Sequence, residues 1–170
     1  MDEARARPAD AFDLSFLRHA DAGDPEAWSG REEERPLSAE GRHQAERLGR
    51  HLAAIGFRVD ELFTSPKVRA AETAAIVGDL VGVRPRPEDR LAEGVTLAVV
   101  EAILVDHGRP AAVLLVGHDP DFSELVSELC GATGVSLRKG GLARLEAGWP
   151  LAAGRATLRW LIPPDALGGA

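Results

Sequence analysis

The chain has a single cysteine, Cys130, among its 170 residues. One cysteine cannot form an internal disulfide, so a reducing compartment is the simplest expectation. The sequence also has no apolar run near the roughly 18 residues that a membrane-spanning helix needs. Residues 1–10 are polar and charged, without the apolar segment of a secretory signal. We therefore expect a cytoplasmic protein that does not use a membrane as its partner.

An excess of positive charge is absent as well. Lys and Arg number 20 against 27 Asp and Glu, which gives a formal net charge of −7 at pH 7. Nucleic acids and anionic membranes select basic faces, so neither is expected as the main partner. The sequence also lacks paired cysteines, an HExxH pair, a GxGxxG turn and a Walker loop. No metal site and no cofactor are therefore predicted.

What the sequence does contain is an alternation of apolar strands and amphipathic helices. Strands are expected near residues 12–17, 61–64, 84–87 and 111–116, followed by a hairpin of residues 141–146 and 156–161. This β-α-β-α-β-α-β-α-β-β order predicts a three-layer α/β/α sandwich with a mostly parallel central sheet and an antiparallel C-terminal hairpin. We expect residues 1–11 to form a flexible tail and residues 12–163 to form a single domain.

Capping residues set the expected helix ends. Ser38 is a suitable N-cap for the first helix, and Gly56 is suited to end it. Ser65 is the expected N-cap of the second helix, with Pro66 as its first residue. Asp119 is interpreted as the N-cap of the helix that follows residues 111–116.

A long polar connection, residues 20–36, follows the first strand. Connections of this length without regular structure are often functional. We expect it to form a rim over the end of the first strand. Its charged run, residues 31–35, is interpreted as a solvated face.

Basic residues and histidines stand where three of the expected strands end. Arg18 and His19 follow the first strand, and His118 follows residues 111–116. Arg69 lies in the first turn of the helix after residues 61–64, where free backbone N–H groups favour an anion. The carboxyl ends of parallel strands share one edge, which is where α/β sheets bind ligands. Guanidinium groups suit phosphate, so this edge predicts a phosphoryl site with a histidine nucleophile or base.

Four stretches of the chain form a recognisable series. They are LRHA at residues 17–20, RPLSAEGRHQA at 35–45, SPKVRAAETA at 65–74 and VGH at 116–118. In this order they resemble the histidine phosphatase superfamily, also called the phosphoglycerate mutase-like family. The short length and the RPLS run look most like the SixA-like phosphohistidine phosphatases. The asparagine that mutases carry after the Arg–His pair is not present here, so mutase activity is not expected.

The resemblance implies a role for each strand-end residue. His19 would be the nucleophile that is transiently phosphorylated. Arg18, Arg69 and His118 would hold the phosphoryl oxygens, and their charge would make a metal unnecessary. Clamping arginines fit this chemistry, because phosphoryl transfer depends on positioning and on stabilising charge at the equatorial oxygens.

The proton donor is open between two carboxylates. Glu93 lies roughly where one branch of the family has a glutamate, and Asp119 lies where the acid phosphatase branch has an aspartate. Glu93 is favoured, since Asp119 has an adequate capping role.

The expected function is therefore a metal-independent phosphatase that dephosphorylates phosphohistidine on a protein, such as a phosphotransfer domain. An imidazole leaves more easily than an alkoxide, so this substrate tolerates a weak proton donor. Two alternatives are a phosphatase for small phosphate esters, such as nucleotides or sugar phosphates, and a weakly active phosphate-binding or interaction module.

Overall fold

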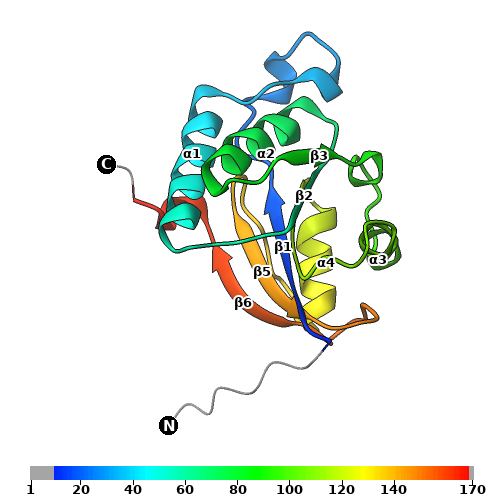
Figure 1. Ribbon diagram of the computed structural model, residues 1–170. Coiled ribbons are helices and arrows are strands. Elements are labelled where there is room, and N and C mark those ends of the chain that lie inside the picture. Colours follow the sequence, from blue (N-terminus) through cyan, green and yellow to red (C-terminus); the bar gives the residue numbers. More distant parts are fainter. Residues whose placement is uncertain (1–9, 169–170) are drawn as a thin grey trace.

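The computed structural model describes residues 10–168, so residues 1–9 of the expected tail lie outside the described residues. A six-stranded sheet with helices on both faces makes up the fold (Figure 1). Its strands are β1 (Phe12–Arg18), β2 (Glu61–Thr64), β3 (Pro85–Pro87), β4 (Ala112–Gly117), β5 (Leu142–Ala147) and β6 (Thr157–Ile162). Each agrees with the sequence-based prediction to within one residue at either end.

The sheet has the strand order β3-β2-β4-β1-β5-β6. The pairs β3–β2, β2–β4 and β4–β1 are parallel, whereas β1–β5 and β5–β6 are antiparallel. The predicted α/β/α class, with a mostly parallel sheet and an antiparallel C-terminal hairpin, is confirmed. The proline-containing β3 lies at one edge, as expected of residues that cannot donate to a ladder.

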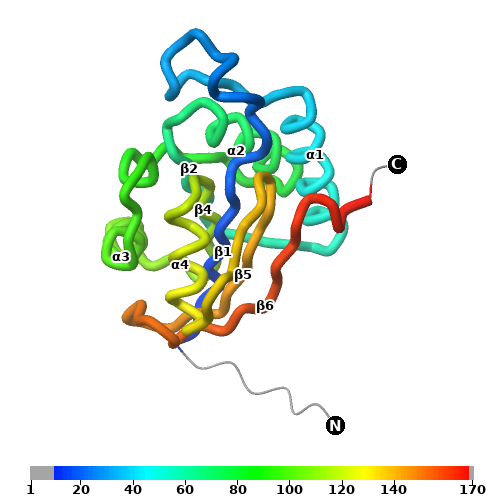
Figure 2. Tube along the Cα trace, turned by 180° about the vertical axis from the view of Figure 1, so that it is seen from behind, coloured from blue at the N-terminus to red at the C-terminus, as the bar shows by residue number. Residues whose placement is uncertain are grey.

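In the described part of the chain, four α-helices cover the sheet: α1 (Ala39–Ala54), α2 (Val68–Val81), α3 (Leu97–Asp106) and α4 (Asp121–Cys130). Helices α1 and α2 pack on one face, and α3 and α4 pack on the other, which is the near face in Figure 2. The chain thus leaves β1 for one face and leaves the adjacent β4 for the opposite face. Such a switch point opens a crevice at the carboxyl ends of these two strands.

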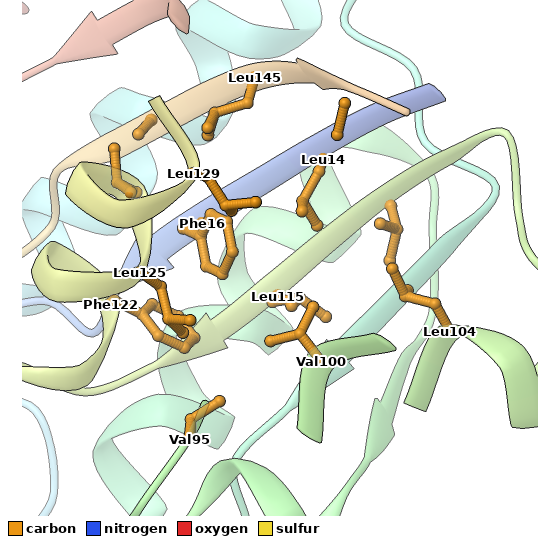
Figure 3. Close-up of a cluster of buried hydrophobic side chains, with 14 of the residues drawn as sticks. Leu14, Phe16, Val95, Val100, Leu104, Leu115, Phe122, Leu125, Leu129 and Leu145 are labelled. Carbon is orange, nitrogen blue, oxygen red and sulfur yellow. The ribbon is translucent and has the colours of Figure 1, made fainter. Parts of the chain in front are cut away.

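Apolar side chains from the sheet and from α3 and α4 form the core on that second face (Figure 3). Phe16 of β1 and Phe122 of α4 meet edge to face, with ring centroids 5.1 Å apart. A Cβ on Gly117 would lie 2.6 Å from the Phe122 ring, so only glycine allows this contact at the end of β4. The packing fixes the start of α4 against the end of β4, the strand that His118 follows. We propose that residues 12–163 form a single domain.

The predicted ends of the first helix are confirmed. The Ser38 hydroxyl accepts a hydrogen bond from the backbone N–H of Gly41 at 3.0 Å. Gly56 follows the last turn with φ +70°, a conformation that glycine adopts without strain. Within residues 10–168, the structure contains no helix of the length and apolarity required to cross a membrane.

The predicted starts of two other helices were wrong. Helix α2 begins at Val68 with Lys67 as its N-cap, and not at the Ser65–Pro66 pair. The Ser65 hydroxyl instead forms a hydrogen bond with the ring of His118. Helix α4 has Pro120 as its N-cap, so Asp119 stands one residue too early. Its carboxylate nevertheless accepts a hydrogen bond from the backbone N–H of Ser123 at 3.2 Å.

Candidate functional site

The carboxyl ends of β1, β4 and β2 place their following residues side by side. Strand pairing aligns Arg18 with Gly117 and Thr64 with Val116. Backbone hydrogen bonds continue this register by one residue, because His19 N donates to Gly117 O and Ser65 N donates to Val116 O, both at 2.9 Å. The imidazole centroids of His19 and His118 consequently lie only 5.2 Å apart.

His19 is held as a neutral imidazole with a defined tautomer. Its side chain is 7% exposed, and Nδ1 lies 2.7 Å from the carbonyl oxygen of Ala20. A carbonyl only accepts, so Nδ1 carries the proton and Nε2 keeps its lone pair. The pKa of His19 is lowered from 6.5 to about 4. Burial is the largest cause, the Ala20 hydrogen bond opposes it, and the charges of Arg69 and Arg18 add to it. At neutral pH, Nε2 is therefore available as a nucleophile.

His118 is also buried, with 9% of its surface exposed. Its Nε2 lies 2.7 Å from the hydroxyl oxygen of Ser65. That oxygen accepts from the backbone N–H of Lys67 at 3.3 Å and has its own proton left to donate to Nε2. When the hydroxyl donates in this way, Nδ1 carries the ring proton of His118. Burial is the largest cause that lowers the pKa of His118 to about 3, followed by repulsion from His19 when that ring is protonated and from Arg69.

Two arginines flank the histidines. Arg18 donates from Nη1 to the carbonyl oxygen of Leu137 at 2.8 Å and to the carboxylate of Asp119 at 3.2 Å. Arg69 is 6% exposed and donates from Nη1 to the backbone oxygen of Glu32 at 2.9 Å. In both side chains these contacts leave the Nε–H without a partner.

Buried donors without partners gather at this edge of the sheet. Among residues 10–168, four buried side-chain N or O atoms have no hydrogen-bond partner, and three of them are Arg18 Nε, Arg69 Nε and His118 Nδ1. The fourth is Ser15 Oγ, within β1. An unpaired buried polar group costs about 1–3 kcal/mol, so three N–H donors at one edge form an arrangement suited to an anion. This is the chemistry of a phosphoryl-binding site next to a neutral histidine.

The two candidate proton donors differ in their surroundings. The carboxylate of Asp119 accepts from Arg18 and also from the Ser123 hydroxyl at 2.7 Å. Glu93 is solvent-exposed, in the loop before Val95. No hydrogen bond or ion pair among the described residues joins Glu93 to His19 or to the groups around it. The structure thus gathers Arg18, His19, Arg69 and His118 without linking Glu93 to them.

The sequence-based prediction did not anticipate the contacts of three residues near the site. Arg35 was taken as part of a solvated face, which is wrong, since it is 7% exposed and bonded within the 20–36 connection. Lys139 pairs with Asp21 at 3.1 Å, and its charge helps to lower the pKa of His19. Ser65 was assigned to a cap. Of these three residues, only Arg35 had a signal in the sequence that could have indicated a role, because it begins the RPLS run.

Metal-binding side chains do not gather in the described part of the chain. Among residues 10–168, no three His, Cys, Asp or Glu side chains are arranged to hold a metal ion. The independence of the reaction from metals remains a prediction.

The fold and this cluster define an α/β protein with a buried neutral histidine beside buried arginine N–H groups that have no partner, at one edge of the sheet. Comparisons with known proteins agree. The model of a family described as histidine phosphatase superfamily (branch 1) matches residues 14–96, a range that includes Arg18, His19 and Arg69. An uncharacterized protein of Picosynechococcus sp. is 30% identical over 143 residues, which cover 81% of this chain and 86% of that protein.

Solved structures share the fold over almost the full chain. A putative phosphohistidine phosphatase SixA from Nakamurella is 27% identical, with TM-score 0.75 and coverage of 91% of this chain and 96% of that one. The protein histidine phosphatase SixA complexed with tungstate has TM-score 0.80 at 23% identity, covering 92% and 100%. A mycobacterial glucosyl-3-phosphoglycerate phosphatase has TM-score 0.66 at 18% identity, covering 89% and 99%.

The chain belongs to the histidine phosphatase superfamily. It is a phosphatase-like enzyme of that superfamily, and the resemblance seen in its sequence is confirmed.

Proposed function

We propose that the protein is a phosphatase that acts through a phosphohistidine intermediate on His19, with phosphohistidine on a protein as its favoured substrate. The observation that carries the proposal is the fixed tautomer of His19. The Nδ1–H bond to Ala20 O leaves the Nε2 lone pair free beside the unpaired donors of Arg18, Arg69 and His118.

The proposed reaction has two displacements at phosphorus. In the first, Nε2 of His19 forms a bond to phosphorus while the bond to the leaving nitrogen or oxygen breaks, and the leaving group takes up a proton. In the second, water attacks phosphorus, the N–P bond breaks, and Nε2 regains its electron pair. The proton of the water passes to the released phosphate. Arg18, Arg69 and His118 stabilise the charge on the equatorial oxygens in both steps.

The surroundings of the carboxylates favour phosphohistidine over an ester. The oxygens of Asp119 are occupied by Arg18 and Ser123, and Glu93 is exposed. We propose Glu93 as the donor where one is needed. An alkoxide must be protonated as it leaves, whereas an imidazole leaves far more easily. A site with a weakly placed donor therefore suits phosphohistidine.

An open groove beside Arg18 also supports a protein substrate. It has a volume of about 430 Å³, and its lining includes Gln44, Arg47 and Lys139. The lining carries charges of both signs, because Arg47 pairs with Glu40 and Arg138 pairs with Asp165, so the groove offers a protein substrate room and polar contacts next to Arg18. The solved phosphatases of SixA type are named for the same substrate class.

The test is a parallel assay on a phosphohistidine-containing phosphotransfer protein, an aryl phosphate and a panel of sugar phosphates and nucleotides. We expect the highest kcat/KM on the phosphohistidine protein and no turnover by His19→Ala. His43→Ala, an exposed histidine of α1, serves as the matched control. A clear preference for the esters would favour the small-ester alternative. Turnover by His19→Ala near the wild-type rate would overturn the mechanism.

The assay also separates the third possibility, a phosphate-binding module. A wild-type protein that binds tungstate but turns over none of these substrates would be such a module. The buried neutral His19 argues against it, because anion binding alone has no need of a nucleophile.

A further inference from the structure

The long connection between β1 and α1 is tied together by one buried arginine, Arg35. Its Nε and Nη2 donate to the two carboxylate oxygens of Glu32, at 3.0 and 2.8 Å. Its Nη1 donates to the backbone oxygens of Ala22 and Gly23, at 2.7 and 3.2 Å. Each nitrogen of Arg35 is engaged inside the connection, so its guanidinium is not oriented toward a ligand. The side chain holds the two limbs of the connection at a fixed separation.

Glu32 connects the Arg35 guanidinium to Arg69 at the candidate site. Its backbone oxygen accepts from Arg69 Nη1 at 2.9 Å, and its carboxylate oxygen Oε1 lies 3.3 Å from Arg69 Nη2. Two of the three nitrogens of Arg69 are therefore restrained by a residue whose own position is set by Arg35. The remaining nitrogen, Nε, is buried and without a partner.

We propose that Arg35 is a positioning residue, which acts through Glu32 to direct the Nε–H of Arg69 at the phosphoryl group. The inference rests on the proposed function, because it takes Arg69 as a ligand of the phosphoryl oxygens. A bidentate pair between guanidinium and carboxylate fixes both distance and plane, which a lysine cannot reproduce. Small displacements of a clamping group are costly in phosphoryl transfer, since catalysis there depends on positioning.

An exposed salt bridge would not have this effect. Arg50 and Glu46 form such a pair at 3.1 Å along α1, with side chains 66% and 40% exposed. Exposed pairs contribute little, so this pair provides matched control variants. Glu32 is 51% exposed, much as Glu46 is, but the Arg35 side chain is only 8% exposed, and the buried arginine separates the two cases.

The experiment is a double-mutant cycle on kcat/KM for an aryl phosphate, with wild type, Arg35→Lys, Arg69→Ala and the double variant. A displaced Arg69 predicts a loss of about tenfold for Arg35→Lys. In the Arg69→Ala background the same substitution should change kcat/KM by less than about twofold, because its effect passes through Arg69. Arg50→Lys should match wild type. Equal losses from Arg35→Lys in both backgrounds would overturn the inference.

A second variant and a binding measurement keep the inference testable without turnover. If Arg35→Lys does not fold, Glu32→Gln replaces it, with Glu46→Gln as its control, and the same dependence on Arg69 is expected. Tungstate binding, measured by calorimetry, should weaken in Arg35→Lys only when Arg69 is present. Equal tungstate affinity of wild type and Arg35→Lys would refute the positioning role. A different result would refute the proposed function and leave the positioning role intact. In that case Arg35→Lys would weaken tungstate binding only when Arg69 is present, but the wild-type protein would have no phosphatase activity.

Discussion

Acid should destabilise the protein through His19. The folded protein holds this imidazole neutral, because burial and neighbouring cations lower its pKa from 6.5 to about 4. The unfolded chain takes up the proton below pH 6.5, whereas the folded chain does not until about pH 4. The free energy of unfolding therefore falls as the pH drops through this window. Above pH 6.5 both states are neutral at this residue, and His19 contributes no pH dependence.

The magnitude follows from the width of that window. Each pH unit between the two pKa values is worth about 1.4 kcal/mol, so His19 alone accounts for a loss of about 3 kcal/mol by pH 4. Replacing His19 by glutamine removes the titrating group and keeps a side chain that can donate to Ala20 O. Between pH 7 and pH 4.5, wild type should lose about 2–3 kcal/mol more than His19→Gln.

Urea unfolding at the two pH values, for both proteins, measures this difference. The other titrating groups are present in both proteins, so the difference reports His19 together with its coupling to the neighbouring His118. Parallel losses in the two proteins would refute the reasoning. They would mean that His19 is not held neutral, and the case for Nε2 as a nucleophile at neutral pH would fail with it.

Three further experiments concern the proton donor, the contact between the first turn of α1 and Asp21, and the role of metals. Glu93→Gln and Asp119→Asn should be compared on an aryl and an alkyl phosphate; if Glu93 is the donor, its variant loses about 10²-fold on the alkyl ester only. No effect of either substitution on the alkyl ester would place the donor elsewhere. Gly41→Ala should cost about 1–3 kcal/mol in urea unfolding, because a Cβ there would collide with the backbone oxygen of Asp21. Unchanged stability would contradict that packing. Dialysis against EDTA should leave kcat/KM unchanged, and a loss that a divalent cation restores would contradict the predicted independence from metals.

The fold could be predicted from the sequence because its signals are local. The apolar run at residues 111–116 identifies a central strand, and the turn formers around Gly148 identify the final hairpin. Ser38 begins a helix through its own hydroxyl. The site followed from a general rule, since Arg18–His19 and His118 end strands that pair in parallel. Topology then brings the two imidazoles together.

The remaining features depend on contacts between distant residues. Ser65–Pro66 has the pattern of a helix start, but the Ser65 hydroxyl bonds to His118, 53 residues away. Lys139 joins Asp21 across 118 residues, which no local pattern records. Arg35 lies in a charged run that resembles a solvated face. Its burial depends on backbone oxygens at residues 22 and 23 that only the folded connection presents.

The position of the site follows from the topology of the sheet, in which the chain leaves the adjacent strands β1 and β4 for opposite faces. Strands β1 and β4 are neighbours, and their following helices pack on opposite faces. That arrangement leaves His19 and His118 at one edge while burying both. Burial keeps the two imidazoles neutral, and the adjacent arginines supply the positive charge that a phosphoryl group requires.

The central claim is that phosphate is carried transiently on Nε2 of His19. The direct measurement is to mix the enzyme with substrate, quench in alkali, in which N–P bonds survive, and locate the phosphate by peptide mass spectrometry and NMR of phosphorus. We predict a single acid-labile phosphate on His19, attached at Nε2, which forms and decays at rates compatible with kcat. Phosphate on another residue, or full turnover with no phosphoenzyme, would contradict the account.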